Sequence, residues 1–149
     1  MCLSAPTATP LSPAVVRPPT SFLESFPASQ SSRGSVTWTT LFSTQLAAGV
    51  ASCPPRGFLG LHKHTQPELY HVLSGRGVVE IEGAAYELEK GMTVFIPGDA
   101  EHGVRNEGAE DFRWLYVFPG RFEDVEYRFR AEGAYGSESK ASAASKAKL

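Results

Sequence analysis

Three of the four histidines and one glutamate of this 149-residue chain have a spacing that suits metal binding. Side chains at positions i and i+2 of an extended strand point to the same face, so His62 and His64 present two imidazoles together. Glu68 follows past Pro67 and can supply a carboxylate oxygen from the next strand. His102 can complete the set from a third strand. Three imidazole nitrogens and one carboxylate suit a divalent iron, manganese, nickel, zinc or copper ion.

The first half of this pattern resembles the first motif of the cupin family. That motif has a His-x-His pair, then three or four intervening residues and a glutamate, then six intervening residues and a glycine. Here His62, His64, Glu68 and Gly75 occupy these positions, and the motif's leading glycine is displaced by one residue to Gly57. None of the ligand positions is altered by that displacement.

The second half resembles the second motif of the same family. Gly91, Pro97, His102 and Asn106 have the expected spacing, and the glycine that follows the proline is shifted to Gly98. The resemblance implies that His62, His64, Glu68 and His102 bind one divalent metal ion per chain. Fe(II) is the favoured ion, with zinc, manganese, nickel or copper as alternatives.

Tyr70 lies two residues after Glu68 and so shares its face of the strand. It is either a barrel aromatic whose hydroxyl reaches a backbone group or a functional group beside the metal. The Glu-x-Tyr extension resembles the small cupin lyases that cleave dimethylsulfoniopropionate. That resemblance implies that Tyr70 is a base that removes a proton α to a metal-bound carboxylate.

An aromatic strand follows the second motif and offers candidate substrate contacts. Trp114 and Tyr116 alternate on one face, where they either pack in the core or line a pocket and stack on an unsaturated substrate. Arg105 and Arg128 could hold a substrate carboxylate, although solvated surface charge is the simpler interpretation for both.

Three hypotheses for the function follow. The chain resembles the small single-domain cupin oxidoreductases of fungal polyketide clusters, which implies a metal-dependent oxidoreductase acting on a small aromatic or polyketide-derived metabolite. The alternative is a lyase or isomerase of the dimethylsulfoniopropionate-cleaving type. The third is a ligand-binding cupin without turnover, which retention of all four ligand positions disfavours.

The remaining sequence predicts an all-β domain. Short β-rich runs cover 36–42, 58–64, 68–74, 78–81, 85–88, 93–96, 102–105, 112–118 and 125–129, separated by Gly, Pro and Asn turns. One short helix is expected at 22–26, because Ser21 and Glu24 have capping-box spacing. The cupin resemblance implies a double-stranded β-helix, a small jelly-roll barrel, over residues 35–130.

The two ends differ in composition from this domain. Residues 1–34 are rich in proline and serine and predict a flexible arm, and residues 131–149 predict a disordered tail. The chain ends in Ala147-Lys148-Leu149, a variant of the Ser-Lys-Leu peroxisomal address. Peroxisomal import and a chance tripeptide both remain open.

Bulk properties limit the partners. A net charge of −2 gives no electrostatic footprint for nucleic acid or an anionic membrane, so neither is expected to bind. Cys2 and Cys53 form no disulfide framework, and the first residues make a poor signal peptide. We therefore expect a cytoplasmic protein, unless the terminal tripeptide acts, with a small-molecule substrate and a possible homodimer.

Overall fold

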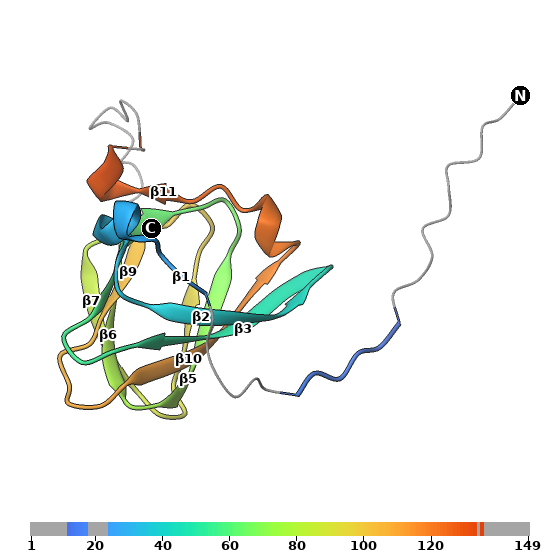
Figure 1. Ribbon diagram of the computed structural model, residues 1–149, viewed down its shortest axis with the longest axis horizontal. Coiled ribbons are helices and arrows are strands. Elements are labelled where there is room, and N and C mark those ends of the chain that lie inside the picture. The colour runs from blue at the N-terminus through green and yellow to red at the C-terminus, as the bar shows by residue number, and fades with distance from the viewer. Residues whose placement is uncertain (1–11, 18–23, 134, 136–149) are drawn as a thin grey trace, which may run out of the picture.

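The computed structural model describes residues 12–17, 24–133 and 135, and the described part is built from two antiparallel sheets (Figure 1). The six-stranded sheet has the order β1 (Glu24–Ser25), β2 (Thr37–Ser43), β3 (Leu46–Cys53), β10 (Phe112–Pro119), β5 (Glu68–Ser74) and β8 (Thr93–Ile96). The five-stranded sheet has the order β11 (Arg128–Phe129), β4 (Phe58–Lys63), β9 (His102–Arg105), β6 (Arg76–Ile81) and β7 (Ala84–Glu89). The two sheets form the jelly-roll β-barrel that the sequence predicts.

Side chains that point alternately inward and outward along the strands fill the interior of the barrel. In β10 the aromatic residues Phe112, Trp114, Tyr116 and Phe118 are all buried, whereas the residues between them are half-buried on the outer face. Successive strand side chains point to opposite faces, so this single strand places four large rings inside. The barrel interior is therefore strongly aromatic on the side of the six-stranded sheet.

Strand β3 is absent from the runs predicted by the sequence, and its position explains its composition. It pairs with β2 on one side and β10 on the other. Its inward residues are small: Ala51 lies between Trp38 and Trp114, and Gly49 lies beside Tyr116 in the same registers. Large neighbours leave no room for large residues here, so β3 lacks the bulky residues typical of a strand.

Two other expectations differ from the structure. The helix expected at 22–26 is replaced at its described end by strand β1, which pairs with β2 through Glu24 and Ser25. The strand expected at 125–129 is shorter in the structure, where β11 covers only Arg128–Phe129 and follows the short 3-10 helix η2 (Phe122–Asp124). The capping-box spacing at Glu24 is overridden by pairing with the sheet.

The N-terminal segment lies against one end of the barrel. After β1, the 3-10 helix η1 (Ala28–Arg33) packs near the other end of the described chain, where η3 (Arg130–Glu132) follows β11 (Figure 1). Within the expected arm, residues 24–33 therefore hold local structure. Residues 136–149, with the terminal tripeptide, lie outside the described residues.

Asn106 of the second motif has a structural role. Its Nδ2 donates hydrogen bonds to the carbonyls of Cys53 (2.9 Å) and Glu110 (2.7 Å), and its Oδ1 accepts one from the Gly108 amide (2.9 Å). The side chain is buried, so these bonds satisfy polar atoms that water cannot reach. Asn106 thereby fixes the loop between β9 and β10.

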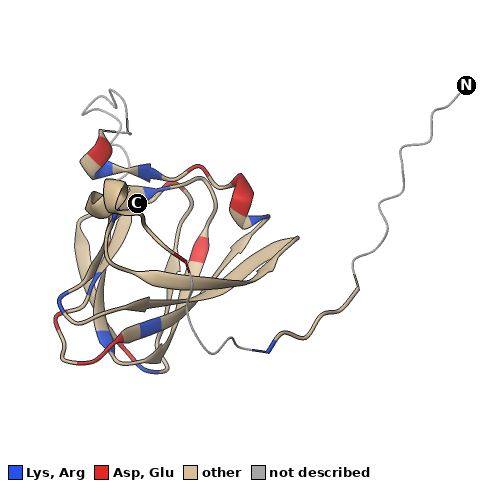
Figure 2. Cartoon of the chain, in the orientation of Figure 1, with Lys and Arg blue, Asp and Glu red and all other residues tan. Residues whose placement is uncertain are grey.

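Charged residues of both signs are interspersed along the strands and loops of the barrel (Figure 2). Several form exposed pairs, among them Arg76 with Glu89 and Arg130 with Glu101. None of the helices formed by the described residues has the length and apolar character needed to span a bilayer.

Candidate metal centre

The register of the five-stranded sheet brings two of the histidines together. His62 of β4 pairs with His102 of β9, and Phe129 of β11 pairs with His62 on its other side. Paired residues on neighbouring strands have side chains on the same face of the sheet. The rings of His62 and His102 consequently lie with centroids 4.2 Å apart inside the barrel.

His64 and Glu68 reach the same point from the chain between β4 and β5. His64 follows the last residue of β4, and Glu68 is the first residue of β5, which belongs to the opposite sheet. The Nε2 atoms of His64 and His102 lie 3.1 Å and 3.2 Å from the Glu68 Oε2 atom. The first motif thus connects the two sheets at the site.

All four side chains are buried, and the three histidines can offer ligand atoms that lie within 4.8 Å of one another. A buried cluster of imidazoles next to a carboxylate is costly unless something compensates the lost hydration. A divalent cation provides that compensation, because it bonds directly to the inward lone pairs. The donor set therefore fits a divalent metal ion.

Backbone carbonyls fix the orientation of each imidazole. The Nδ1 atoms of His62, His64 and His102 donate to the carbonyls of Gly60 (2.7 Å), Gln66 (3.0 Å) and Ala100 (2.8 Å), respectively. A carbonyl can only accept, so each Nδ1 carries a proton and Nε2 is the nitrogen left to bind a metal ion. Such outer hydrogen bonds are typical of metal-binding histidines.

The pKa values of two groups favour the ligand forms. Burial, reinforced by the neighbouring His102, holds the pKa of His62 well below its usual value, so the ring is neutral at pH 7. Burial alone would raise the pKa of Glu68, but contacts with His102 and His64 outweigh it and lower the pKa to about 2. Glu68 is therefore a carboxylate at neutral pH.

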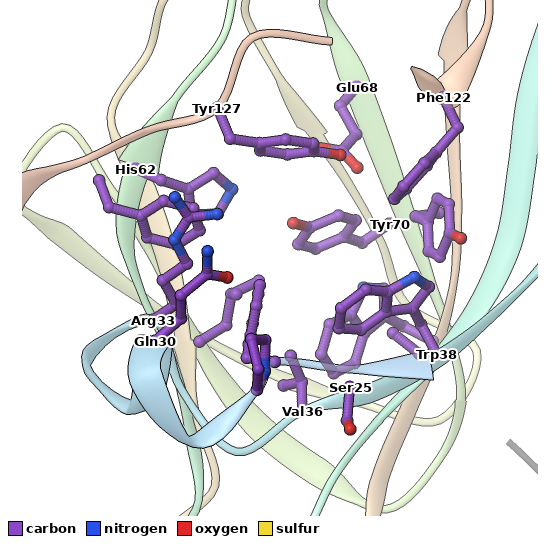
Figure 3. Close-up of a pocket in the computed structure, with 17 residues that line it drawn as sticks. Ser25, Gln30, Arg33, Val36, Trp38, His62, Glu68, Tyr70, Phe122 and Tyr127 are labelled. Atoms are coloured by element: carbon purple, nitrogen blue, oxygen red, sulfur yellow. The ribbon is translucent and has the colours of Figure 1, made fainter. Parts of the chain in front are cut away.

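A cavity of about 300 Å³ opens beside this cluster (Figure 3). His62 and Glu68 line it, and most of its remaining wall is aromatic. The aromatic residues are Phe26, Trp38, Tyr70, Trp114, Tyr116, Phe122, Tyr127 and Phe129. A small apolar cavity with a few convergent polar groups is the usual form of a small-molecule site.

Three of the non-ligand residues singled out by the sequence, Tyr70, Trp114 and Tyr116, line this cavity. Tyr70 is buried with its ring 5.4 Å from that of Trp114, and its hydroxyl projects into the cavity (Figure 3). Burial, together with the charge of Glu68, raises the pKa of Tyr70 well above its usual value. The hydroxyl of Tyr116 lies 3.4 Å from that of Thr40, and burial raises its pKa to about 12.

Several cavity residues come from segments that the sequence analysis did not connect with the site. Tyr127 lies between β10 and β11, with its ring 5.4 Å from His64 and 5.8 Å from His62. Gln30 and Arg33 come from η1, which lies in the expected flexible arm. No local motif marks these residues, because their proximity depends on how two segments far apart in the sequence pack on the barrel.

Other candidates lie elsewhere. His71 is on the outer face of β5, and its Nδ1 is 2.7 Å from the Thr93 hydroxyl. Arg105 pairs with Glu107, and Arg128 is exposed. None of the three lines the aromatic cavity, so the arginine beside it is Arg33.

Comparisons with known proteins concern the family and the fold of the chain. The cupin domain model matches residues 49–118. The chain is 43% identical over 105 residues to dimethylsulfoniopropionate lyase DddW of Ruegeria pomeroyi, covering 66% of this chain and 68% of the relative.

Solved structures also resemble the barrel. A predicted oxalate decarboxylase from Thermotoga maritima superposes with a TM-score of 0.55 at 27% identity, covering 58% of this chain and 83% of the other. The polyketide cyclase RemF of Streptomyces resistomycificus gives a TM-score of 0.56 at 22% identity, covering 63% of this chain and 70% of the other. At that identity the likeness to RemF concerns the fold alone. From its motifs, its barrel and its similarity to DddW, the chain belongs to the cupin family.

Proposed function

We propose that this protein is a metal-dependent lyase that acts on a small carboxylate carrying a leaving group on its β-carbon. Its ligands are His62, His64, Glu68 and His102, and the first substrate to test is dimethylsulfoniopropionate. The observation that carries the proposal is the position of Tyr70, whose hydroxyl projects into an aromatic cavity beside the histidine and glutamate cluster.

The bound metal would supply Lewis acidity, which polarises a substrate oxygen and stabilises a nearby phenolate. Tyr70 takes the proton from the α-carbon. The electrons of that C–H bond form a double bond to the β-carbon, and the bond from the β-carbon to sulfur breaks. The sulfur keeps that electron pair, so a sulfonium substrate yields a neutral dialkyl sulfide and an unsaturated carboxylate.

The aromatic wall supports a cationic leaving group. Trp38, Trp114 and Tyr116 line the cavity. Aromatic ring faces attract sulfonium or quaternary ammonium groups by cation–π interaction. A desolvated contact of this kind contributes about 2 kcal/mol. The apolar wall also excludes water from the base.

The lyase is favoured here over the oxidoreductase that the sequence resemblance implies. The similarity to DddW covers about two thirds of both chains. Glu68 and Tyr70 form the Glu-x-Tyr extension by which this sequence resembles the dimethylsulfoniopropionate lyases. The polyketide-derived substrate and the choice of Fe(II) remain predictions from the resemblance.

The test compares the two chemistries directly. Protein loaded separately with iron, manganese, nickel or zinc is assayed with dimethylsulfoniopropionate in air and under anaerobic conditions, and sulfide release and oxygen uptake are followed together. The lyase predicts equal rates with and without oxygen and activity with more than one metal. Turnover that requires iron and consumes oxygen in step with product would favour the oxidoreductase instead.

A further inference from the structure

The cavity has a polar side that is formed outside the barrel strands. Gln30 and Arg33 of η1 line it and lie on the same side as His62, whereas Trp38 and Phe122 lie across from them (Figure 3). The cavity is therefore two-ended. One end carries hydrogen-bond donors next to the candidate metal centre, and the other is aromatic.

One edge of the Arg33 guanidinium is paired with the Glu132 carboxylate. Its Nε and Nη2 atoms donate to the Glu132 carboxylate at 2.7 Å and 3.1 Å, and its central carbon lies 4.6 Å from the Phe129 ring centroid. A guanidinium has five N–H donors in a rigid fork, and this pair occupies one side of that fork. The Nη1 side is not engaged by any contact described for Arg33.

The segment that carries this pair is fixed before any ligand binds. The backbone N–H of Gln30 donates to the Pro27 carbonyl at 2.8 Å, and the backbone of Gly34 forms an isolated β-bridge with Leu59 of β4. Phe26 packs on the Trp38 ring with centroids 5.0 Å apart. A donor pair held in this way loses little conformational freedom when it binds a ligand.

We propose that Arg33 and Gln30 bind the carboxylate of the substrate and draw it to the His62 side of the cavity. A planar carboxylate accepts charge-assisted hydrogen bonds from a guanidinium and an amide. The opposite end of the substrate then lies among the aromatic rings. This assignment rests on the proposed function for the identity of the substrate, but it concerns binding and not turnover.

A structural role is the competing explanation. If Arg33 served only to join the two ends of the chain, loss of Glu132 would be as harmful as loss of Arg33. If Arg33 binds a carboxylate, replacing Glu132 frees the guanidinium and leaves that binding intact or stronger. The two explanations therefore differ in the behaviour of the Glu132 variant.

The experiment measures binding by titration calorimetry on the metal-loaded protein. The probes are 3-(trimethylammonio)propionate, whose amine is a poor leaving group, and the matching carboxamide. Arg33→Gln and Gln30→Ala should each weaken carboxylate binding by about tenfold or more, the usual cost of a lost charge-assisted bond. Carboxamide binding should change less than twofold. Glu132→Gln should keep wild-type affinity or improve it.

Two controls separate binding from folding. Arg130→Gln removes an exposed pair with Glu101 that does not line the cavity, and it should change nothing. Arg33→Lys keeps the charge without the fork and should recover part of the affinity. Thermal unfolding of each variant shows whether the fold persists.

Unchanged carboxylate binding in Arg33→Gln, or an equal loss in Glu132→Gln, would overturn the proposal. Because neither probe needs to react, the expected binding pattern without any lyase turnover would leave this subsite standing and would remove only the proposed reaction.

Discussion

The hydroxyl of Tyr116 occupies the space that a side chain on Gly49 would need. A Cβ on Gly49 would lie 2.1 Å from that hydroxyl oxygen and 2.5 Å from the Thr39 carbonyl oxygen. Tyr116 pairs with Gly49 in the sheet, and Gly49 pairs with Thr40, whose hydroxyl meets that of Tyr116. The tyrosine thus crosses over the glycine to reach the next strand.

We therefore expect Gly49→Ala to displace Tyr116 and to destabilise the barrel. Overpacking of this kind costs about 1–3 kcal/mol, so the unfolding midpoint should fall clearly in urea. Gly108→Ala is the matched control, since its Cβ would come no closer than 3.3 Å to another residue. Equal midpoints for the two variants would contradict the close packing at Gly49.

The same pair of residues shows why one strand escapes prediction from sequence. β-branched and aromatic residues usually identify a strand in a short stretch of sequence. In β3, however, the inward residues opposite Tyr116 and Trp114 must have small side chains. The information that defines β3 therefore resides in β10, more than sixty residues away. Propensity within a window cannot include it.

The same contrast holds for the candidate site, where the sequence could predict the grouping of some residues but not of others. The grouping of its candidate ligands could be predicted, because His62, His64 and Glu68 are close in the chain. The positions of Gln30, Arg33 and Tyr127 could not, because these residues reach the cavity only after segments far apart in the sequence have packed on the barrel.

Removal of either of two ligands should abolish metal binding without unfolding the protein. His64→Ala and His102→Ala each delete an inward nitrogen, and the aromatic core on β10 does not depend on them. Elemental analysis should find about one metal per chain in the wild type and far less in both variants. His71→Ala is the control, because that ring lies on the outer face. Full occupancy in the ligand variants would refute the assignment.

Acid should destabilise the metal-free protein. The pKa of His62 in the folded state lies well below the ordinary value of 6.5, so the unfolded chain binds more protons in this range. The stabilisation from neutral His62 is thus complete above about pH 6.5 and is lost as the pH falls below it. Protonation of Glu68 also lowers the stability of the folded state as the pH falls, but over a lower range, between pH 4.5 and about 2.

Thermal unfolding of the chelated protein at a series of pH values measures this dependence. The midpoint should fall between about pH 7 and pH 5 in the wild type and should fall less in His62→Gln, which cannot charge. A midpoint that stays constant over this range would show that His62 does not titrate as its burial implies.

Tyr70→Phe should distinguish a proton-abstracting base from a packing residue. The substitution removes only the hydroxyl, which projects into the cavity, and it leaves the ring against Trp114. In the proposed lyase the loss of a positioned base should lower kcat by about 100-fold or more. In an oxygen-dependent reaction it would remove a supporting hydrogen bond, and a loss of about tenfold is expected.

Two measurements make that result specific. Tyr86→Phe alters an exposed tyrosine on β7 and should leave kcat and KM unchanged. The metal content of Tyr70→Phe should equal that of the wild type, because the ligand nitrogens and Glu68 are untouched. Wild-type turnover in metal-replete Tyr70→Phe would exclude Tyr70 as the base and would direct attention to Tyr127, a cavity tyrosine whose ring packs beside His62 and His64.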